Sequence, residues 1–373
     1  MRTVVKLGTS TLTQGTPCLS SPLVVDLARQ IARLASEGEE ILLVSSGAIA
    51  AGREQLGFPD LPKDIPVKQM LAAVGQPRLM AFYEQVFALY GVTVAQILLT
   101  RRDFSSRRGY LNARNALLAL LGRGVLPIIN ENDTVATEEI RVGDNDNLSA
   151  LVANLVDADR LVLLTDQPGL FTADPRNDPG ARLVEEISGP EIGPELWRAA
   201  GGSGCGLGTG GMATKLMAAD LARRSGTGCV IARGSEPDVL LRIARGEKLG
   251  TRILPTASAV ESRKRYILSG SQSPGKLTVD VGAARALARG GSLLPVGVTA
   301  VEGSFERGDT VRVTLPGGRE IARGIVNYDG RDIARILRSP SDAIESILGY
   351  RFGDEVIHHN NMVLISTIPE ETT

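Results

Sequence analysis

Apolar and polar positions alternate in blocks along the first 255 residues, and these blocks predict strands and helices in turn. Residues 3–7 are a short apolar run that ends at Gly8, which is typical of a buried strand. A helix is expected next, with Ser21 and Pro22 as its N-cap and first residue and Gly38 just after its end. The apolar residues of this helix have the spacing of one helix face: Leu23, Leu27, Ile31 and Leu34.

The same alternation continues to residue 231. Further strands are expected at residues 41–44, 92–99, 125–129, 160–164 and 229–231. Further helices are expected at about residues 66–90, 112–121, 148–156 and 212–224. Such alternation predicts an α/β fold with a mainly parallel sheet covered by helices on both faces. Ligands of these sheets bind beyond the carboxyl ends of the strands, so polar motifs at strand ends are the candidate site.

The pattern changes after residue 255, the expected end of a catalytic domain over residues 1–255. Residues 256–274 begin with a polar, charged stretch and are expected to link two domains. Short apolar segments and glycine-containing turns then predict a small β-barrel-like domain over 275–353, followed by a tail over 354–373. Its expected strands lie at residues 276–279, 297–301, 310–315 and 320–327.

The amino-acid composition excludes several classes of function and of catalytic site. The 373 residues include 41 Lys and Arg and 42 Asp and Glu, a balance that argues against a general polyanion binder. The two histidines are His358 and His359, which excludes a Ser-His-Asp triad or an HExxH zinc site from residues 1–357. Three widely separated cysteines exclude a disulfide framework. With no apolar run near the roughly 18 residues of a membrane span and no signal-peptide pattern, we expect a cytoplasmic protein.

Two motifs at expected strand ends combine glycine with groups that bind anions. In VVKLGTS, Lys6 places a positive charge beside Gly8, where the backbone can approach an anion closely. In SSGAIAAGR, the Ser46 hydroxyl and the free amides of a helix start can hold a carboxylate or a phosphate. A solvated lysine and simple helix capping by serine are the alternative interpretations.

Acidic and amide residues cluster in two neighbouring segments. NENDTVAT contains Asp133, and VGDNDNLSA contains Asn145 and Asp146. Such groups can accept hydrogen bonds from an ammonium group, or orient lysines or a Mg²⁺ ion. Capped acidic turns are the alternative, but two clusters this close together favour a site.

A glycine-rich loop precedes the expected helix at residues 212–224. Its segment GLGTGGMATK contains a literal GxGxxG, but no strand precedes it, which argues against a dinucleotide site. A glycine loop that enters a helix beside Lys215 suits a triphosphate, whereas a surface loop is the alternative. Thr165 and Asp166 lie at another strand end, ahead of FTADP, and are a weaker signal on their own.

Taken in order, six motifs resemble those of the amino acid kinase family, and within it the glutamate 5-kinases. They are VVKLGTS, SSGAIAAGR, NENDTVAT, VGDNDNLSA, LLTDQPGL with FTADP, and GTGGMATK. The segment from about residue 275 to 352 resembles a PUA domain. The resemblance implies ATP-dependent phosphorylation of the γ-carboxylate of L-glutamate to L-glutamyl 5-phosphate, the first step of proline biosynthesis. It also implies Mg²⁺ bound through the nucleotide phosphates, feedback inhibition by proline, and a dimer or tetramer, and it leaves a contact with glutamyl phosphate reductase open.

The resemblance assigns roles residue by residue. Lys6 and Lys215 would contact the phosphates, and Asp146 would orient both lysines. The remaining ATP-binding residues would be Thr165, Asp166, Thr209, Gly210, Gly211, Met212, Ala213 and Thr214. Glutamate would be held by Ser46, Asp133 and Asn145. The residue inventory agrees, because a glutamate carboxylate with a pKa near 4.3 is already a nucleophile at neutral pH and needs no general base.

Two other functions stay open at this stage. Another amino acid kinase would act on N-acetylglutamate, carbamate, aspartate or a nucleoside monophosphate. PUA domains also occur in RNA-binding proteins, but residues 276–373 hold 11 Lys and Arg against 13 Asp and Glu, whereas RNA-binding domains usually carry a basic excess. A structural or regulatory role of the second domain is therefore expected. Cys205 in the glycine loop is a candidate for oxidation.

Overall fold

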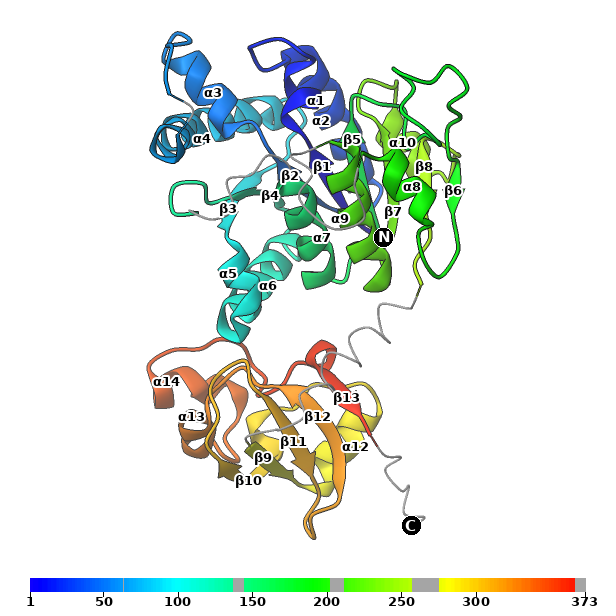
Figure 1. Ribbon diagram of the computed structural model, residues 1–373. Coiled ribbons are helices and arrows are strands. Elements are labelled where there is room, and N and C mark those ends of the chain that lie inside the picture. The colour runs from blue at the N-terminus through cyan, green and yellow to red at the C-terminus, as the bar shows by residue number, and fades with distance from the viewer. Residues whose placement is uncertain (63, 137–143, 202–210, 257–274, 366–373) are drawn as a thin grey trace. The chain divides into compact units, whose positions relative to one another are not determined.

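The chain forms two compact units in the computed structural model (Figure 1). The first comprises Met1–Arg102 and Ala113–Ala259, and the second comprises Asp103–Asn112 and Val260–Thr373. The structure describes residues 1–62, 64–136, 144–201, 211–256 and 275–365. No helix in these ranges is both long and apolar enough to cross a membrane.

An eight-stranded sheet forms the centre of the first unit, in the order β3-β4-β2-β1-β5-β7-β8-β6. Its strands are β1 (Arg2–Leu7), β2 (Glu40–Ser45), β3 (Val94–Leu99), β4 (Leu126–Glu131), β5 (Arg160–Thr165), β6 (Glu186–Ile187), β7 (Gly228–Arg233) and β8 (Thr251–Ile253). From β3 to β7 all neighbours are parallel, and β8 pairs antiparallel with β7. The predicted α/β fold with a mainly parallel sheet is therefore confirmed. β6 and β8 were not predicted, because two or three residues do not show a periodicity.

The helices of this part of the chain follow the strands closely. They are α1 (Thr9–Thr13), α2 (Ser21–Ser36), α3 (Ala48–Gln55), α4 (Ile65–Ala88), α5 (Arg101–Ser105), α6 (Arg107–Leu121), α7 (Asp144–Leu155), α8 (Pro194–Ala199), α9 (Met212–Arg224) and α10 (Val239–Ala244). The N-cap of α2 is Ser20 rather than Ser21, because Ser20 is the residue with extended dihedral angles. α6 and α7 begin earlier than predicted, since their first turns are polar and lack an apolar periodicity.

Helices cover both faces of the first sheet. α2, α4 and α10 pack on one face, where Val5 of β1 and Leu43 of β2 point. α7 and α9 pack against each other and against β1, β5 and β7 on the opposite face. Because successive side chains of a strand point to opposite faces, Lys6 lies on the α7 and α9 face. The sheet register thus aims a lysine at the N-terminal ends of two helices.

α3 and α4 pack against each other with their backbones in contact. A Cβ atom on Gly75 would lie 1.8 Å from the carbonyl oxygen of Ala48, and one on Gly52 would lie 2.0 Å from that of Leu71. Only glycine permits this separation at both positions. Since α3 begins directly after the end of β2, this packing holds one edge of the candidate site in place.

A five-stranded sheet, in the order β10-β9-β11-β12-β13, forms the second unit. Its strands are β9 (Gly275–Val279), β10 (Val298–Gly303), β11 (Thr310–Thr314), β12 (Glu320–Ile325) and β13 (Met362–Leu364), and it includes the helices α12 (Val281–Ala288), α13 (Gly330–Arg335) and α14 (Ile344–Leu348). The four predicted strands are present. Part of the expected tail contributes β13 and the buried Val356 and Ile357 to this unit, so its core extends past residue 353. Of the expected connection over 256–274, only Thr256 lies within the described residues.

Candidate active site

The candidate residues meet in one pocket of about 1710 Å³ in the first unit. It lies where β1, β2, β4 and β5 end, which is the location that a parallel sheet favours for ligands. The lining includes Lys6, Ser46, Asp133, Asn145, Asp146, Thr165, Asp166, Gly211, Met212, Ala213 and Lys215. Thr214 reaches the same cluster through a hydrogen bond to Asp146. Thr209 and Gly210 lie outside the described residues.

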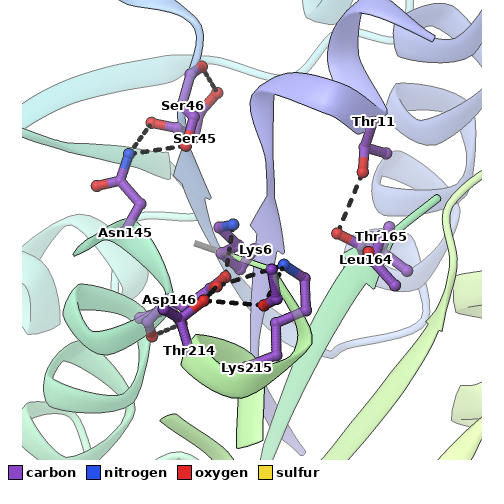
Figure 2. Close-up of polar contacts among 12 residues, drawn as sticks. Lys6, Thr11, Ser45, Ser46, Asn145, Asp146, Leu164, Thr165, Thr214 and Lys215 are labelled. Carbon is purple, nitrogen blue, oxygen red and sulfur yellow. Dashed lines mark hydrogen bonds and ion pairs between the residues drawn. The ribbon is translucent and has the colours of Figure 1, made fainter. Parts of the chain in front are cut away.

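Two lysines share one buried carboxylate at the base of this pocket (Figure 2). Lys6 Nζ lies 2.6 Å from Asp146 Oδ1, and Lys215 Nζ lies 3.4 Å from Asp146 Oδ2. The Thr214 hydroxyl, 2.7 Å from Asp146 Oδ2, donates a further hydrogen bond to that oxygen. All three charged side chains are buried. Lys6 of β1 is 4% exposed, Asp146 of α7 is 1% exposed and Lys215 of α9 is 8% exposed. Burial of two cations with one anion leaves one positive charge in excess, which suits a polyanionic ligand.

Burial and mutual charge shift the pKa values of this cluster. Burial is the largest cause that lowers the pKa of Lys6, and the nearby charge of Lys215 lowers it further, against the opposing effect of Asp146. Burial alone would raise the pKa of Asp146, but the two lysines and the Thr214 hydrogen bond outweigh it, and that pKa is lowered. Asp146 is therefore ionised and holds both lysines in place. An anion that binds beside Lys6 would stabilise the protonated form of that lysine.

Two glycines at the pocket wall have backbone angles that other residues rarely adopt. Gly47, between β2 and α3, has φ of 108°, and Gly211, the N-cap of α9, has φ of 106°. Neither helix has a side-chain cap, so the first backbone amides of α3 and α9 have no capping acceptor from the N-cap residue. Such amides bind carboxylates and phosphates.

The end of β5 supplies another polar wall. Thr165 is buried, and its hydroxyl donates a hydrogen bond of 3.0 Å to the exposed carboxylate of Asp166. The backbone of this strand end is held from α1, where the Thr11 hydroxyl donates to the carbonyl oxygen of Leu164. Thr165 and Asp166 thus line the pocket on the side of β5.

Amide and hydroxyl groups line the side formed by β2, β4 and α7. The side-chain amide of Asn145 donates to Ser46 Oγ at 2.9 Å and to Asn130 Oδ1 at 3.0 Å. Asp133, in the turn that follows β4, is half-buried and faces the same pocket. The structure therefore brings together Ser46, Asp133 and Asn145, although they come from three separate segments.

Several lining residues were not singled out from the sequence. Arg53, Lys68, Arg176 and Arg198 add positive charge to the pocket walls. Arg53 is the last residue of the motif SSGAIAAGR, so the sequence could have identified it as a candidate. Arg176 directly follows the motif FTADP, whereas Lys68 of α4 and Arg198 of α8 stand in segments that show no motif.

The described residues contain no group of three or more His, Cys, Asp or Glu that could hold a metal ion. Asp146, the most deeply buried carboxylate of the pocket, is already paired with two lysines. Asp146 is therefore engaged by the two lysines rather than available as a ligand of a divalent ion.

The amino acid kinase family matches residues 1–233, and the PUA domain matches residues 275–348. The glutamate 5-kinase of Shewanella amazonensis is 54% identical over 99% of this chain and 97% of its own length. Those of Photobacterium profundum and Deinococcus radiodurans are 54% and 52% identical, over 97% and 98% of this chain and 96% and 100% of their own. The solved UMP kinase of Bacillus anthracis aligns with 69% of this chain and 96% of its own at 18% identity and a TM-score of 0.47, which adds nothing to the assignment.

A family match over more than half of the chain and relatives above 50% identity over nearly all of it agree with the geometry of the pocket. The chain belongs to the amino acid kinase family, among the glutamate 5-kinases, and carries a PUA domain.

Proposed function

We propose that the protein transfers the terminal phosphoryl group of ATP to the side-chain carboxylate of L-glutamate, giving L-glutamyl 5-phosphate and ADP. This is the first step of proline biosynthesis. Beyond the family, the observation that carries the proposal is the buried pair of Lys6 and Lys215 on the two oxygens of Asp146. A buried cluster with one excess positive charge, in a pocket with no histidine among its lining residues, suits transfer of an anionic group to an acceptor that is already ionised.

The triphosphate is proposed to lie against Lys6, Lys215 and the amides at the start of α9. Met212, Ala213 and Thr214 begin that helix, with Gly211 as its N-cap, and Thr209 and Gly210 come before it in the sequence. Thr165 and Asp166 would hold the nucleotide at the end of β5. Mg²⁺ would neutralise phosphate charge as part of the nucleotide, with no ligand cage of its own on the protein.

The glutamate is proposed to lie against Ser46, Asp133 and Asn145. The carboxylate of Asp133 and the amide oxygen of Asn145 accept hydrogen bonds from the α-ammonium group. The Ser46 hydroxyl and the amides at the start of α3 donate to a carboxylate. The positive ammonium group thus meets hydrogen-bond acceptors, and a negative carboxylate meets hydrogen-bond donors.

The reaction needs alignment more than acid–base chemistry. An oxygen of the substrate carboxylate forms a bond to the γ-phosphorus while the bond to the leaving oxygen of ADP breaks. The carboxylate is ionised at neutral pH, so no proton has to be removed. Asp146 keeps the ammonium groups of Lys6 and Lys215 apart and directed at the phosphoryl oxygens, where negative charge develops.

The activity is tested by ADP release from MgATP with L-glutamate, with hydroxylamine as the trap for the acyl phosphate. We expect glutamate-dependent hydroxamate, and little or none with N-acetylglutamate, because acetylation removes the ammonium group. Turnover with N-acetylglutamate but not with glutamate would keep the kinase fold and overturn the substrate. Adding proline to the same assay tests feedback inhibition.

Further proposals concern the whole protein. The catalytic domain is proposed to comprise residues 1–255, joined by 256–274 to a PUA domain that begins at residue 275 and whose core includes Val356, Ile357 and β13 beyond residue 353. We also propose a homodimer or homotetramer, inhibition by proline, and glutamyl phosphate reductase as the enzyme that receives the labile product. A reducing cytoplasm is the proposed location, supported by the unpaired state of Cys18 and Cys229.

A further inference from the structure

Four side-chain amides form a hydrogen-bonded chain that leads from α4 and β3 to the glutamate side of the pocket. Asn145 Nδ2 donates to Asn130 Oδ1 at 3.0 Å, and Asn130 Nδ2 donates to Gln76 Oε1 at 2.9 Å. Gln76 Nε2 then donates to Gln96 Oε1 at 3.2 Å. Asn130 is 2% exposed and Gln76 is 9% exposed. Buried amides are costly unless they are bonded, and apolar side chains would fill this space between helix and sheet at a lower cost.

Two backbone groups fix the direction of this chain. The amide N–H of Glu131 can only donate, and it lies 2.9 Å from the Asn130 atom that therefore must be Oδ1. The carbonyl oxygen of Ser45 can only accept, and it lies 3.3 Å from the Asn145 atom that therefore must be Nδ2. With both amides held in this orientation, neither can exchange its oxygen and nitrogen without losing hydrogen bonds.

The consequence appears at the pocket wall. Asn145 Oδ1 is buried and has no hydrogen-bond partner within the described part of the chain. Ser46 Oγ already accepts from Asn145 Nδ2, which leaves the Ser46 hydroxyl hydrogen available to donate. An unused acceptor and an available donor thus lie on neighbouring side chains of one pocket. That pairing is complementary to the ammonium and carboxylate groups of a free amino acid.

We propose that Gln76 and Asn130 are positioning residues that hold Asn145 with its oxygen towards the substrate ammonium group. In this way they set the preference for an α-amino dicarboxylate over the same dicarboxylate without its amino group. The inference rests on the proposed function, because it concerns the same substrate site. Neither residue touches the reacting atoms, so the effect belongs to recognition of the amino group and not to phosphoryl transfer.

The test compares L-glutamate with glutarate, which lacks the amino group, in the hydroxamate assay with the full-length protein. Gln76→Met keeps a similar length and volume but removes the acceptor for Asn130. We expect it to lower the ratio of kcat/KM for glutamate to kcat/KM for glutarate about tenfold, through KM for glutamate. The KM for ATP and the kcat with glutamate should stay within about twofold of the starting protein.

Two further variants separate positioning from stability. Gln30→Met is the matched control, because Gln30 is a fully buried glutamine in α2 that bonds Asp26 and the amide of Leu240 away from the pocket. It should leave the substrate ratio unchanged even where it lowers the melting temperature. Gln76→Glu retains an oxygen for Asn130, and the exposed Gln96 can turn its amide towards it, so the ratio should be kept.

The outcomes are distinct. An unchanged ratio in Gln76→Met, or an equal loss for glutamate and glutarate, overturns the inference while the kinase assignment stands. If Gln76→Glu loses the preference for glutamate over glutarate, the inference is overturned as well. The Gln76→Glu result decides the question even where Gln76→Met does not fold. Absence of glutamate-dependent hydroxamate in the unchanged protein is instead a failure of the proposed function.

Discussion

Asp146 has the lowest exposure of the charged residues in the pocket, and its two oxygens serve different lysines. A carboxylate with a single partner would leave the second ammonium group to be repelled by the first. Here each lysine has its own oxygen, so both charges can be kept at one place in a region of low polarity. Without a bound anion, the second buried ammonium group carries an uncompensated charge, which costs free energy. A bound anionic ligand would remove that cost.

Replacing either lysine should therefore slow catalysis more than it weakens binding. We expect Lys6→Ala and Lys215→Ala each to lower kcat by about 10²–10³-fold, since a charge that stabilises the transferring group is lost. Lys68→Ala is the control, because Lys68 lines the same pocket outside the cluster. Steady-state kinetics with hydroxamate detection measures the effect. Near-normal kcat in either variant would remove that lysine from the proposed mechanism.

The lowered pKa of Lys6 predicts an alkaline limit to nucleotide binding. Lys6 attracts phosphate only when protonated, and burial lowers its pKa below the ordinary value of about 10.4. Affinity for MgATP should thus fall as the pH rises through this lowered pKa, earlier than for an ordinary lysine. Lys6→Arg keeps its charge over that range and should give a flatter profile. Calorimetric titration of each protein with MgATP, without glutamate and from neutral pH to about pH 10, measures both affinities. If the affinity falls equally with pH in both proteins, the proposed contact between Lys6 and the phosphates is contradicted.

At the scale of elements, the position of the site depends on how closely two helices approach. α3 starts two residues after Ser46, and α4 carries Gln76 next to the Gly75 that meets the backbone of α3. The same stretch of α4 thus supports the start of α3 and contributes to the amide chain. A small displacement of α4 would therefore disturb both sides of the glutamate pocket.

Gly75→Ala should separate the two helices. Its Cβ would lie 1.8 Å from the carbonyl oxygen of Ala48, so we expect a loss of about 1–3 kcal/mol in the free energy of unfolding and a raised KM for glutamate. Gly122→Ala is the control, since its nearest neighbour would be 3.4 Å away. Denaturant unfolding and substrate titration give the two readouts. Equal stability of the two variants would show that the contact between α3 and α4 can relax at little cost.

At the scale of the whole molecule, the pocket lies within one compact unit. Every lining residue comes from Met1–Arg102 or Ala113–Ala259, and the second unit has its own sheet and its own apolar core. The described residues proposed to bind the nucleotide and the amino acid therefore all belong to the first unit. For the PUA domain, we expect a role in regulation or assembly rather than in the chemistry.

A chain ending at residue 256 should consequently keep glutamate-dependent turnover. We expect kcat within about threefold of the full-length protein, since the charged cluster and both substrate walls are retained. Hydroxamate formation with and without proline, alongside thermal unfolding and sizing, distinguishes loss of catalysis from loss of regulation or assembly. A folded truncated protein without turnover would contradict the separation of roles.

The outline of the first unit could be predicted from the sequence because its strands are buried on both faces. Continuous apolar runs such as 41–44 and 161–164 stand out between helices, and polar motifs follow them directly. The short strands β6 and β8 at one end of the sheet could not be found, because segments of two or three residues show no periodicity. Gln76 gave no functional signal either. It is one of several polar residues in α4, and its partners lie on β3 and β4, which become its neighbours only when the sheet forms.

What the sequence alone determined is the kind of chemistry. Because the histidines are confined to residues 358 and 359, catalysis by residues 1–357 has to use lysines, carboxylates, hydroxyls, backbone amides or a bound ion. Only the tertiary structure decided which charges meet. Lys6 and Lys215 share Asp146 because β1 lies between β2 and β5 and its alternating side chains place Lys6 on the face covered by α7 and α9. Strand order and the face of a sheet are properties of the folded chain, and local sequence does not contain them.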